Sequence, residues 1–325
     1  MNDEEVDKAV AILRGGGLVA FPTETVYGLG ADARNPRAIE KLYAAKGRPA
    51  DHPVIVHLAE VSQLDGWACD ITPMAEKLAR KFWPGPLTLI LKRAPGVIDA
   101  VTGGQDSVGI RIPSHPLAHL LLEKFGGGIA APSANRFGRV SATLADHVRR
   151  EFGDAVDFVF DEGECDVGIE STIVDARGEA PVLLRPGHIT AHDIEQAAGV
   201  ALVAPDAHSP RASGTLAAHY APATPLLVME SDLLLELAAT LTRQGKRVAV
   251  LARSASQPLL TGLTWIAASG DADSFAHDLY ANLRILDGAG CAVILVEQPP
   301  QRPEWAAVHD RIARAAAGSA PPSTP

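Results

Sequence analysis

The sequence predicts an α/β protein with two domains, the first built on a twisted mixed sheet and the second on a smaller parallel sheet. Short apolar runs typical of buried strands alternate with amphipathic helical stretches along almost the whole chain. Within residues 1–203 some connections between strands are short and others contain a helix, so antiparallel and parallel pairings are both expected. After a proline-rich break, strands and helices alternate regularly, which is typical of a parallel sheet.

Composition predicts a folded, acidic protein. The chain has 325 residues, of which 47% are hydrophobic, which is enough to bury a core and excludes wholesale disorder. The net charge of −10 disfavours strong non-specific binding of nucleic acids. No apolar run is long enough to span a membrane, and the acidic start MNDEEVDKAV is unlike a signal peptide. The three cysteines lie too far apart for a disulfide framework, which favours the cytoplasm; they are Cys69, Cys165 and Cys291.

Helix starts in the first domain are marked by capping residues. Asn35-Pro36 and Thr72-Pro73 combine a side-chain cap with a proline at the first helical position. Thr143 and Thr190 supply the same kind of cap without a proline. The helices expected are 3–14, 35–45, 72–83, 116–125, a helix capped by Thr143, and 190–198.

Apolar runs between these helices predict the strands of the first sheet. The strands expected are 18–21, 53–58, 87–92, 108–112, 129–131, 158–160, 172–175 and 182–184. Polar residues cluster at several of their ends, where α/β proteins place ligands. We therefore expect the functional site at these strand ends, in a first domain covering residues 1–203.

Residues 204–225, with the sequence APDAHSPRASGTLAAHYAPATP, predict an interdomain linker because four prolines interrupt the alternation of strands and helices. Beyond them a Rossmann-like parallel α/β domain is expected over residues 226–318, followed by a flexible tail over 319–325. The second domain lacks both the G-x-G-x-x-G and the P-loop pattern, so nothing marks it as a nucleotide site. Its expected elements are strands 226–229, 247–251 and 292–296 and helices 232–243, 275–286 and 304–317.

Four stretches of the first domain carry candidate chemistry, each with a structural alternative. FPTETVYGLG groups polar side chains that suit a small polar ligand, or a locally capped turn. Lys46 and Arg48 suit a polyphosphate, or the C-terminal dipole of the preceding helix. Arg111 lies mid-strand among apolar neighbours, so it needs an anionic ligand or a pairing carboxylate. Ser133 and Asn135, in AAPSAN, offer hydrogen bonds to a ligand or ordinary turn chemistry.

No protein-ligated metal is expected. His52 and His57 lie five residues apart across a predicted strand, so their side chains point to opposite faces. The chain contains no H-E-x-x-H motif and no C-x-x-C motif. Cys165 has no positioned base nearby in the sequence, which disfavours a nucleophilic role.

Taken together, the motifs resemble one family. FPTETVYGLG, KGRP, SVGIRIP, APSAN, GIESTIVD and LLRPG stand in the order and spacing of the YrdC-type L-threonylcarbamoyladenylate synthases. The linker with HYAP and the second α/β domain resemble the longer, two-domain form of that family. The resemblance covers nearly the whole chain, and it implies a YrdC-like twisted mixed sheet around a concave, positively charged pocket.

The resemblance implies an enzyme, a nucleotidyltransferase. It would join L-threonine, bicarbonate or CO₂, and ATP into threonylcarbamoyl-AMP and release pyrophosphate, with Mg²⁺ carried by ATP rather than by protein ligands. A threonylcarbamoyl-transferase complex would then use the product to make threonylcarbamoyladenosine in tRNA, so weak or no direct tRNA binding is expected. No membrane partner and no other cofactor are implied.

The resemblance also assigns site residues. Lys46, Arg48, Ser133 and Asn135 match the family's K-x-R…S-x-N catalytic signature. L-Threonine would lie near Thr25, His57, Arg111, Ala131 and Ser171. ATP would contact Arg48, His52, Ser107, Ser133, Ser141, Arg185 and Tyr220. Two features depart from the family pattern: His52 stands where many relatives carry Asn, and the stretch before HYAP is longer and less basic.

Two other functions, a lid and a docking role are also considered. A relative that forms carbamoyl-adenylate is the alternative enzyme, although the zinc-finger-like and acylphosphatase-like segments of such proteins are not visible here. An RNA-binding translation factor is the alternative of another class, and the acidic charge argues against it. The linker is a candidate active-site lid, because the carbamate intermediate is unstable in water. The second domain is also a candidate docking module for the transferase.

Overall fold

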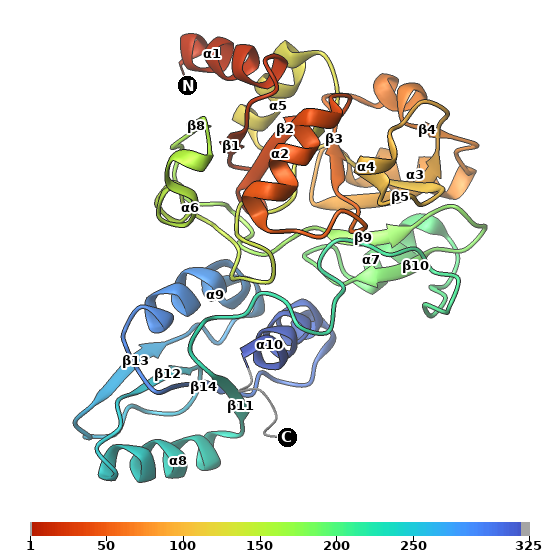
Figure 1. The fold of residues 1–325 in the computed structure, drawn as a ribbon. Helices are drawn as coiled ribbons and strands as arrows, with labels where there is room; N and C mark the ends of the chain where they lie inside the picture. The colour runs from red at the N-terminus through yellow and green to blue at the C-terminus, as the bar shows by residue number, and fades with distance from the viewer. Residues whose placement is uncertain (1, 320–325) are drawn as a thin grey trace. The chain divides into compact units, whose positions relative to one another are not determined.

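The computed structural model describes residues 2–319, which separate into two compact units. The first unit contains the residues up to Phe137 together with Ala142–Thr215, and the second contains Gly138–Ser141 together with the residues from Leu216 onward (Figure 1). The chain therefore passes from one unit to the other inside the expected linker, at residues 215 and 216. The inclusion of 138–141 in the second unit has no counterpart in the sequence pattern. The expected flexible tail lies, apart from Ser319, outside the described residues.

The first unit is built on one large mixed sheet. Its strand order is β10-β9-β5-β6-β3-β7-β2-β1-β8, and β4 pairs with β5 outside this path. The strands are β1 (Val19–Phe21), β2 (Gly28–Asp32), β3 (Ile55–His57), β4 (Ala68–Cys69), β5 (Leu87–Arg93), β6 (Ser107–Arg111), β7 (Ile129–Ala130), β8 (Phe158–Val159), β9 (Thr172–Asp175) and β10 (Val182–Arg185). The helices are α1 (Asp3–Arg14), α2 (Pro36–Lys46), α3 (Pro73–Phe82), α4 (Asp99–Thr102), α5 (Pro116–Phe125), α6 (Ala145–Phe152) and α7 (Ala191–Ala198). This sheet and the parallel second sheet confirm the predicted fold class.

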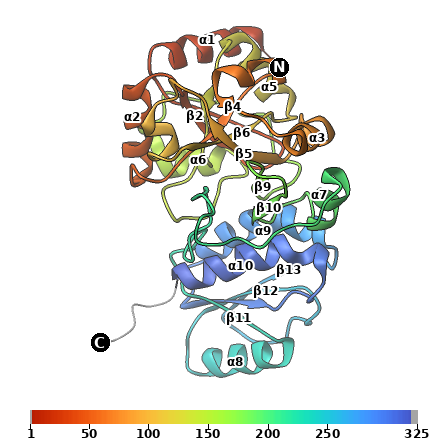
Figure 2. The ribbon, with the colours of Figure 1, turned by 90° about the vertical axis from the view of Figure 1, so that its right-hand side faces the viewer.

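Helices cover the two faces of this sheet unequally. Helices α2, α3, α6 and α7 contribute to one large apolar cluster with the sheet. Helices α1 and α5 lie side by side (Figure 2), and they pack with β1 and β7 in a second cluster. Over the strands between, a small cluster of Ile55, Ile90 and Ile173 is closed by Ala212, a residue of the linker. A stretch of chain without helix or strand therefore lies where a helix would otherwise cover the sheet.

Capping explains which helix starts were predicted correctly. The side chain of Asn35 accepts hydrogen bonds from the amides of Arg37 and Ala38, and Thr72 accepts one from Ala75. The prediction for Thr143 was wrong, because α6 begins after Leu144, whose side chain makes no capping hydrogen bond. The amide of Thr143 instead donates to His147 Nδ1 at 3.3 Å.

The second unit contains a four-stranded parallel sheet in the order β11-β14-β12-β13. Strand β13, in the segment LTWIA, was not predicted, so the sequence indicated only three of these strands. Helix α8 packs on one apolar cluster with β12 and β14. The elements are β11 (Leu226–Met229), α8 (Ser231–Arg243), β12 (Val248–Ala252), β13 (Leu263–Ala267), α9 (Ala272–Asp287), β14 (Val293–Glu297) and α10 (Ala306–Ser319).

A buried carboxylate fills the loop end of this parallel sheet. Glu297, at the end of β14, is 2% exposed and accepts hydrogen bonds from the amides of Arg253, Ser254 and Ala255 at 2.6–3.1 Å. The hydroxyl of Ser231 donates to it at 2.9 Å, and that of Ser254 donates as well. Burial alone would raise the pKa of Glu297, but these hydrogen bonds lower it to about 2.

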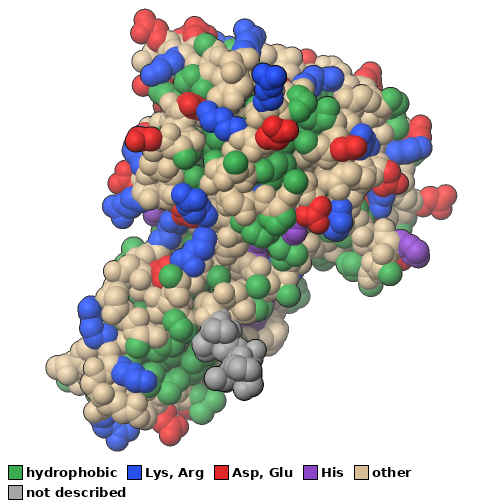
Figure 3. Space-filling view, in the orientation of Figure 1, with side chains coloured by type: hydrophobic (Ala, Val, Ile, Leu, Met, Phe, Trp, Pro, Cys, Tyr) green, Lys and Arg blue, Asp and Glu red, His purple; other side chains and the backbone are tan. Residues whose placement is uncertain are grey.

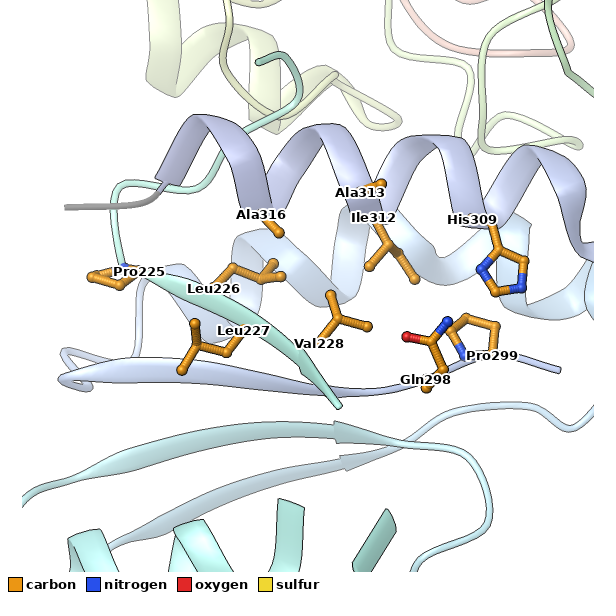
Figure 4. Close-up of a pocket in the computed structure, with 10 residues that line it drawn as sticks. All are labelled: Pro225, Leu226, Leu227, Val228, Gln298, Pro299, His309, Ile312, Ala313 and Ala316. Carbon is orange, nitrogen blue, oxygen red and sulfur yellow. The ribbon is translucent and has the colours of Figure 1, made fainter. Parts of the chain in front are cut away.

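An apolar groove of about 370 Å³ lies between the edge strand β11 and α10 (Figure 4). Leu226 and Val228 of the strand face Ile312 and Ala316 of the helix, and Gln298 and His309 lie at one end. The strand is held to the helix end by its first amide, since Leu226 N donates to Ser319 Oγ at 2.8 Å.

Candidate functional site

Strand register places several of the predicted site residues on one face of the first sheet, which we call the site face. Ser107, Gly109 and Arg111 alternate along β6, so their side-chain positions point to the same side. In the parallel pairing of β3 with β6, Ile55 lies beside Gly109 and His57 beside Arg111. This is the face that carries the Ile55–Ile90–Ile173 cluster and Ala212.

Four predicted threonine-binding residues converge at the end of β6. The guanidinium of Arg111 donates from Nη1 to Thr25 Oγ1 at 2.8 Å and from Nε to the Gly85 oxygen at 3.4 Å. His57 is the register neighbour of Arg111, and Ala131 N donates to the Ile55 oxygen at 3.0 Å. Thr25 is itself held by Thr23, whose hydroxyl lies 2.8 Å from that of Thr25.

His57 is a neutral side chain in this setting. It is 3% exposed, and burial followed by the charge of Arg111 lowers its pKa to about 3, against the opposing effect of a hydrogen bond with the Ile55 backbone. Its Nδ1 has no hydrogen-bond partner among the described residues. A neutral imidazole with a spare ring nitrogen can bind a polar substrate group, but it is a weak base near neutral pH.

Lys46 supports the loop that carries Ser133 and Asn135. Gly47 ends α2 in the left-handed conformation, with a φ of 61°. Lys46 is therefore the last residue of the helix, and Arg48 follows the turn. Lys46 is 2% exposed, and its ammonium donates to the main-chain oxygen of Ser133 at 2.6 Å and to that of Asn135. Burial, and then the charge of Arg48, lowers its pKa to about 7. Its visible role is to position the loop.

Arg48 lies among backbone acceptors and an aromatic ring. Its Nη2 donates to the Pro53 oxygen at 2.7 Å and to Ser213 Oγ at 3.3 Å. Its guanidinium also lies 5.6 Å from the centre of the Phe137 ring. His52 packs against the same ring with centroids 5.3 Å apart, and burial lowers the pKa of His52, as does the charge of Arg48.

Arg185 and Ser171 form the next part of the site. Arg185 Nε and Nη2 donate to the Ser171 oxygen at 3.1 and 2.9 Å, and Ser171 Oγ lies 2.8 Å from Thr88 Oγ1. Nη1 of Arg185 donates to the Ser213 oxygen at 2.9 Å. Arg48 and Arg185, which come from opposite ends of the first unit's sequence, are thus brought together by one residue of the linker.

The linker segment 211–215 is anchored on the first unit at three further points. Gln105 forms a pair of hydrogen bonds with the backbone of Arg211, and Arg211 Nη2 donates to the Gly103 oxygen at 2.9 Å. Ser213 Oγ donates to the Pro53 oxygen at 2.9 Å. With Ala212 on the apolar cluster, these contacts hold the segment against the site face.

Three predicted ATP contacts lie outside this constellation. Ser107 is buried at the opposite end of β6 from Arg111. Ser141 and Tyr220 belong to the second unit, where Arg284 Nε donates to the Ser141 oxygen at 3.1 Å. The Tyr220 side chain is covered: it is 1% exposed, has a φ of 59°, and its ring packs on that of Tyr280.

Sequence reasoning missed two residues of the site. Glu24 lies within FPTETVYGLG, and its carboxylate is 2.7 Å from Arg111 Nη2, so it is the pairing carboxylate that the position of Arg111 called for. The sequence indicated that Arg111 needs an anionic partner, but it did not identify Glu24 as that partner. Ser213 had no signal, because small polar residues are ordinary in a linker.

The described residues offer no ready metal site. Between residues 2 and 319, no group of three His, Cys, Asp or Glu side chains is arranged to hold a metal ion. In the same range, no helix has the length and apolar content to cross a membrane. Figure 3 shows basic and acidic side chains interspersed over the visible face of the first unit.

The fold and this arrangement define a YrdC-type sheet joined to a second, parallel α/β unit. The family model Sua5_yciO_yrdC, described as "Telomere recombination", matches residues 11–187, and the model described as "Threonylcarbamoyl-AMP synthase, C-terminal domain" matches residues 189–317. The chain belongs to the threonylcarbamoyl-AMP synthase family. This membership confirms the resemblance and the function expected from the sequence.

Curated relatives match over nearly their full length. Threonylcarbamoyl-AMP synthase of Pyrococcus abyssi is 39% identical, with 94% of this chain and 92% of the relative covered. The protein of the same name from Bacillus subtilis is 38% identical, with 98% and 94% covered. The crystal structure of P. abyssi Sua5 complexed with L-threonine matches with a TM-score of 0.90 and 37% identity, covering 98% of this chain and 96% of that one.

Proposed function

We propose that this chain makes threonylcarbamoyl-AMP and pyrophosphate from L-threonine, bicarbonate or CO₂, and ATP, as a nucleotidyltransferase. The observation that carries the proposal is the convergence of Thr25, His57, Arg111 and Ala131 at one end of β6. In the same unit, Arg48 and Arg185 both bind Ser213. These are two polar sites on one sheet, one for an amino acid and one for a polyanion. The P. abyssi protein complexed with L-threonine supports the first assignment.

The chemistry has two steps, and both depend on positioning. The threonine ammonium loses a proton to water, and the amine nitrogen attacks the carbon of CO₂. An N–C bond forms as one C–O π bond breaks to give a carboxylate, and the nitrogen loses a second proton to water, which leaves an N-carboxylate. An oxygen of that carbamate then attacks the α-phosphorus of ATP; the new O–P bond replaces the bond to the β-phosphate, and pyrophosphate leaves. Holding the two anions in line and offsetting the charge of the phosphates supplies most of the rate enhancement.

In the proposed threonine site, Arg111 binds the substrate carboxylate in a bidentate manner. A guanidinium suits this role because its N–H groups match both oxygens of a carboxylate. Thr25 and Gly85 fix the plane of the guanidinium, and Ser171 borders the site through Thr88. His57, neutral and buried, orients the substrate.

In the proposed ATP site, Arg48 and Arg185 offset the phosphate charge, and His52 packs on the same Phe137 ring as Arg48. Ser107 remains a proposed ATP contact, although it lies at the opposite end of β6 from Arg111. Lys46 acts through the loop that it holds, because its ammonium is directed at the oxygens of Ser133 and Asn135. The loop then presents Ser133 and Asn135 to the nucleotide. Ser141 and Tyr220 remain proposed ATP contacts, and Tyr220 would have to be uncovered to reach a nucleotide.

We propose that Mg²⁺ enters with ATP. A cation coordinated by phosphate oxygens and water needs few protein ligands. When bound, it would neutralise phosphate charge. The remaining binding and positioning of the phosphates would come from Arg48, Arg185 and the loop that Lys46 supports.

The linker acts as the lid in this proposal. A water-sensitive carbamate needs a covered site, and residues 211–215 already lie on the site face through Ala212 and Ser213. ATP would replace Ser213 as the partner of the two arginines. The linker would therefore move aside to admit the nucleotide and close again over ATP and the carbamate.

The product would pass to a threonylcarbamoyl-transferase complex that acts on tRNA. The net charge of −10, and the mixed charges in Figure 3, support a chain that does not itself hold tRNA strongly. A cytoplasmic location is proposed with it, since the three cysteines are free thiols.

The first experiment measures pyrophosphate release by the purified full chain with ATP, Mg²⁺, bicarbonate and L-threonine, omitting each in turn. Release that requires threonine and bicarbonate, with the adenylate identified by mass spectrometry, is the expected result. An Arg111→Gln variant is the negative control, because it removes the carboxylate-binding group. Release without threonine would contradict the proposal and indicate ATP hydrolysis or another acceptor.

A further inference from the structure

The ion pair between Glu24 and Arg111 does not by itself offset the cost of burying its two charges. The two side chains are 6% and 5% exposed, and Glu24 Oε1 lies 2.7 Å from Arg111 Nη2. Taking both charges out of water is costly, and a buried pair offsets that cost only when further hydrogen bonds satisfy its remaining donors and acceptors.

Those further hydrogen bonds are missing on both sides. Neither carboxylate oxygen of Glu24 has a hydrogen-bond partner among the described residues, and neither does Arg111 Nη2, because their close contact lacks hydrogen-bond geometry. Of the five guanidinium N–H groups, one is donated to Thr25 and one to Gly85. Three N–H groups of Arg111 and both carboxylate oxygens of Glu24 are therefore available for further hydrogen bonds.

Unused hydrogen-bond donors on a cation therefore lie beside unused acceptors on an anion, and one kind of molecule matches this combination. A free α-amino acid carries a carboxylate and an ammonium on the same carbon atom. The first would take the spare N–H groups of Arg111, and the second would give Glu24 the donors that it lacks. The backbone of Glu24 is fixed for this purpose, because the Val167 amide donates to its oxygen at 2.7 Å.

We propose that Glu24 binds the α-ammonium group of L-threonine while Arg111 binds its carboxylate. The inference rests on the proposed function, which places the substrate carboxylate at Arg111. Glu24 then distinguishes an α-amino acid from a hydroxy acid of the same length, and it holds in place the nitrogen that attacks CO₂ after the ammonium has lost a proton to water. No proton transfer to Glu24 is part of the proposal.

The test compares wild type with Glu24→Gln, which keeps the shape of the side chain and removes its charge. We expect the KM for threonine to rise at least about tenfold, as is typical when a charged hydrogen bond is lost, while the KM for ATP stays the same. The control is Glu40→Gln, an exposed residue of α2, which should change neither value.

A second readout uses 3-hydroxybutyrate, which keeps the carboxylate and hydroxyl of threonine but lacks the amine. As a competitive inhibitor it should bind wild type far more weakly than threonine does. In Glu24→Gln the two affinities should converge, and a merely structural role of Glu24 would not produce this convergence. An unchanged preference for threonine in the variant would overturn the proposal.

A shorter acid provides the same test should Glu24→Gln fail to fold. Glu24→Asp keeps the negative charge beside Arg111 but withdraws it from the substrate nitrogen, so the KM for threonine should again rise. A wild-type KM in that variant would overturn the inference. Wild-type protein that forms no threonylcarbamoyl-AMP would contradict the proposed function itself, which is a separate outcome.

Discussion

Arg185 donates from Nη1 to the main-chain oxygen of Ser213 at 2.9 Å, which ties a strand of the first sheet to the linker. Ser213 also accepts from Arg48 through its hydroxyl, so the two cations proposed for ATP are linked by a single residue. Because a triphosphate would offer both arginines stronger acceptors than a carbonyl and a hydroxyl, bound nucleotide would replace Ser213 at the two arginines, and the linker would then close over the nucleotide.

The packing of Ala212 provides a test of the lid. Ala212→Asp places a charge on the cluster of Ile55, Ile90 and Ile173, so the linker should leave the site face. We expect formation of threonylcarbamoyl-AMP to fall by at least about tenfold and the amides of residues 211–215 to exchange hydrogen for deuterium faster. The control is Ala217→Asp, an exposed position of the same linker. Wild-type activity and exchange in Ala212→Asp would exclude the lid.

Replacing Tyr220 tests whether the linker reaches the nucleotide. Tyr220→Ala should weaken ATP binding, measured by titration calorimetry, and lower the melting temperature because a buried ring is lost. Tyr220→Phe keeps the packing on Tyr280 and serves as the control for stability. Unchanged ATP affinity in Tyr220→Ala would remove Tyr220 from the proposed site.

Lys46 is predicted to matter through the loop. Lys46→Met leaves the buried oxygens of Ser133 and Asn135 without their donor, which should cost about 2–3 kcal/mol in urea unfolding and reduce activity. Lys41→Met, on the same helix, breaks only a solvent-exposed pair with Asp157, so its cost should stay below about 1 kcal/mol. Equal stability losses in the two variants would contradict the buried role.

His57 should not contribute a limb to the pH–rate profile. With its pKa lowered to about 3, it is neutral throughout the range in which the enzyme can be assayed near neutrality. We expect His57→Gln to raise the KM for threonine and to leave the shape of the profile between about pH 5 and 8 unchanged. His192→Gln, at an exposed site, controls for the substitution. Loss of a limb in His57→Gln would make His57 a base.

The stability of the chain should depend on Glu297 at acid pH. Its pKa falls from an ordinary value of 4.5 to about 2 on folding, so the stabilisation is complete above pH 4.5 and is lost as the pH falls towards 2. The difference in unfolding free energy between wild type and Glu297→Gln should therefore shrink by about 3 kcal/mol over that window. A difference that is independent of pH would show that Glu297 is not held as a carboxylate.

Local signals predicted the elements that depend on local chemistry. Asn35 and Thr72 cap helices as expected, since a cap acts within three residues. Strand β2, with the sequence GLGAD, was not predicted because its glycines have low strand propensity, and its pairing with β1 and β7 comes from elsewhere in the chain. Strand β13 lies at the edge of its sheet and is only partly buried, so its apolar pattern is weak.

In the candidate site too, the sequence predicted some features and missed others. The motifs singled out Arg111 and Arg48 as candidate functional side chains from their residue types, but the sequence did not identify the residues that contact them. Glu24 meets Arg111 across 87 positions of sequence, and Ser213 meets Arg48 across 165. Such pairs are fixed by sheet register and by the path of the linker, for which a single sequence carries no local signal.

Glu297 has a consequence for how many nucleotides one chain can hold. The amides of residues 253–255, at the loop end of a parallel sheet, form the kind of nest that accepts a phosphate in many α/β proteins. Here a tethered carboxylate is a built-in competitor, and tethering gives it an effective concentration in the millimolar range or above. We therefore expect free nucleotide to be excluded from this end of the second sheet, so that one chain would bind one ATP, at the site proposed for the first unit.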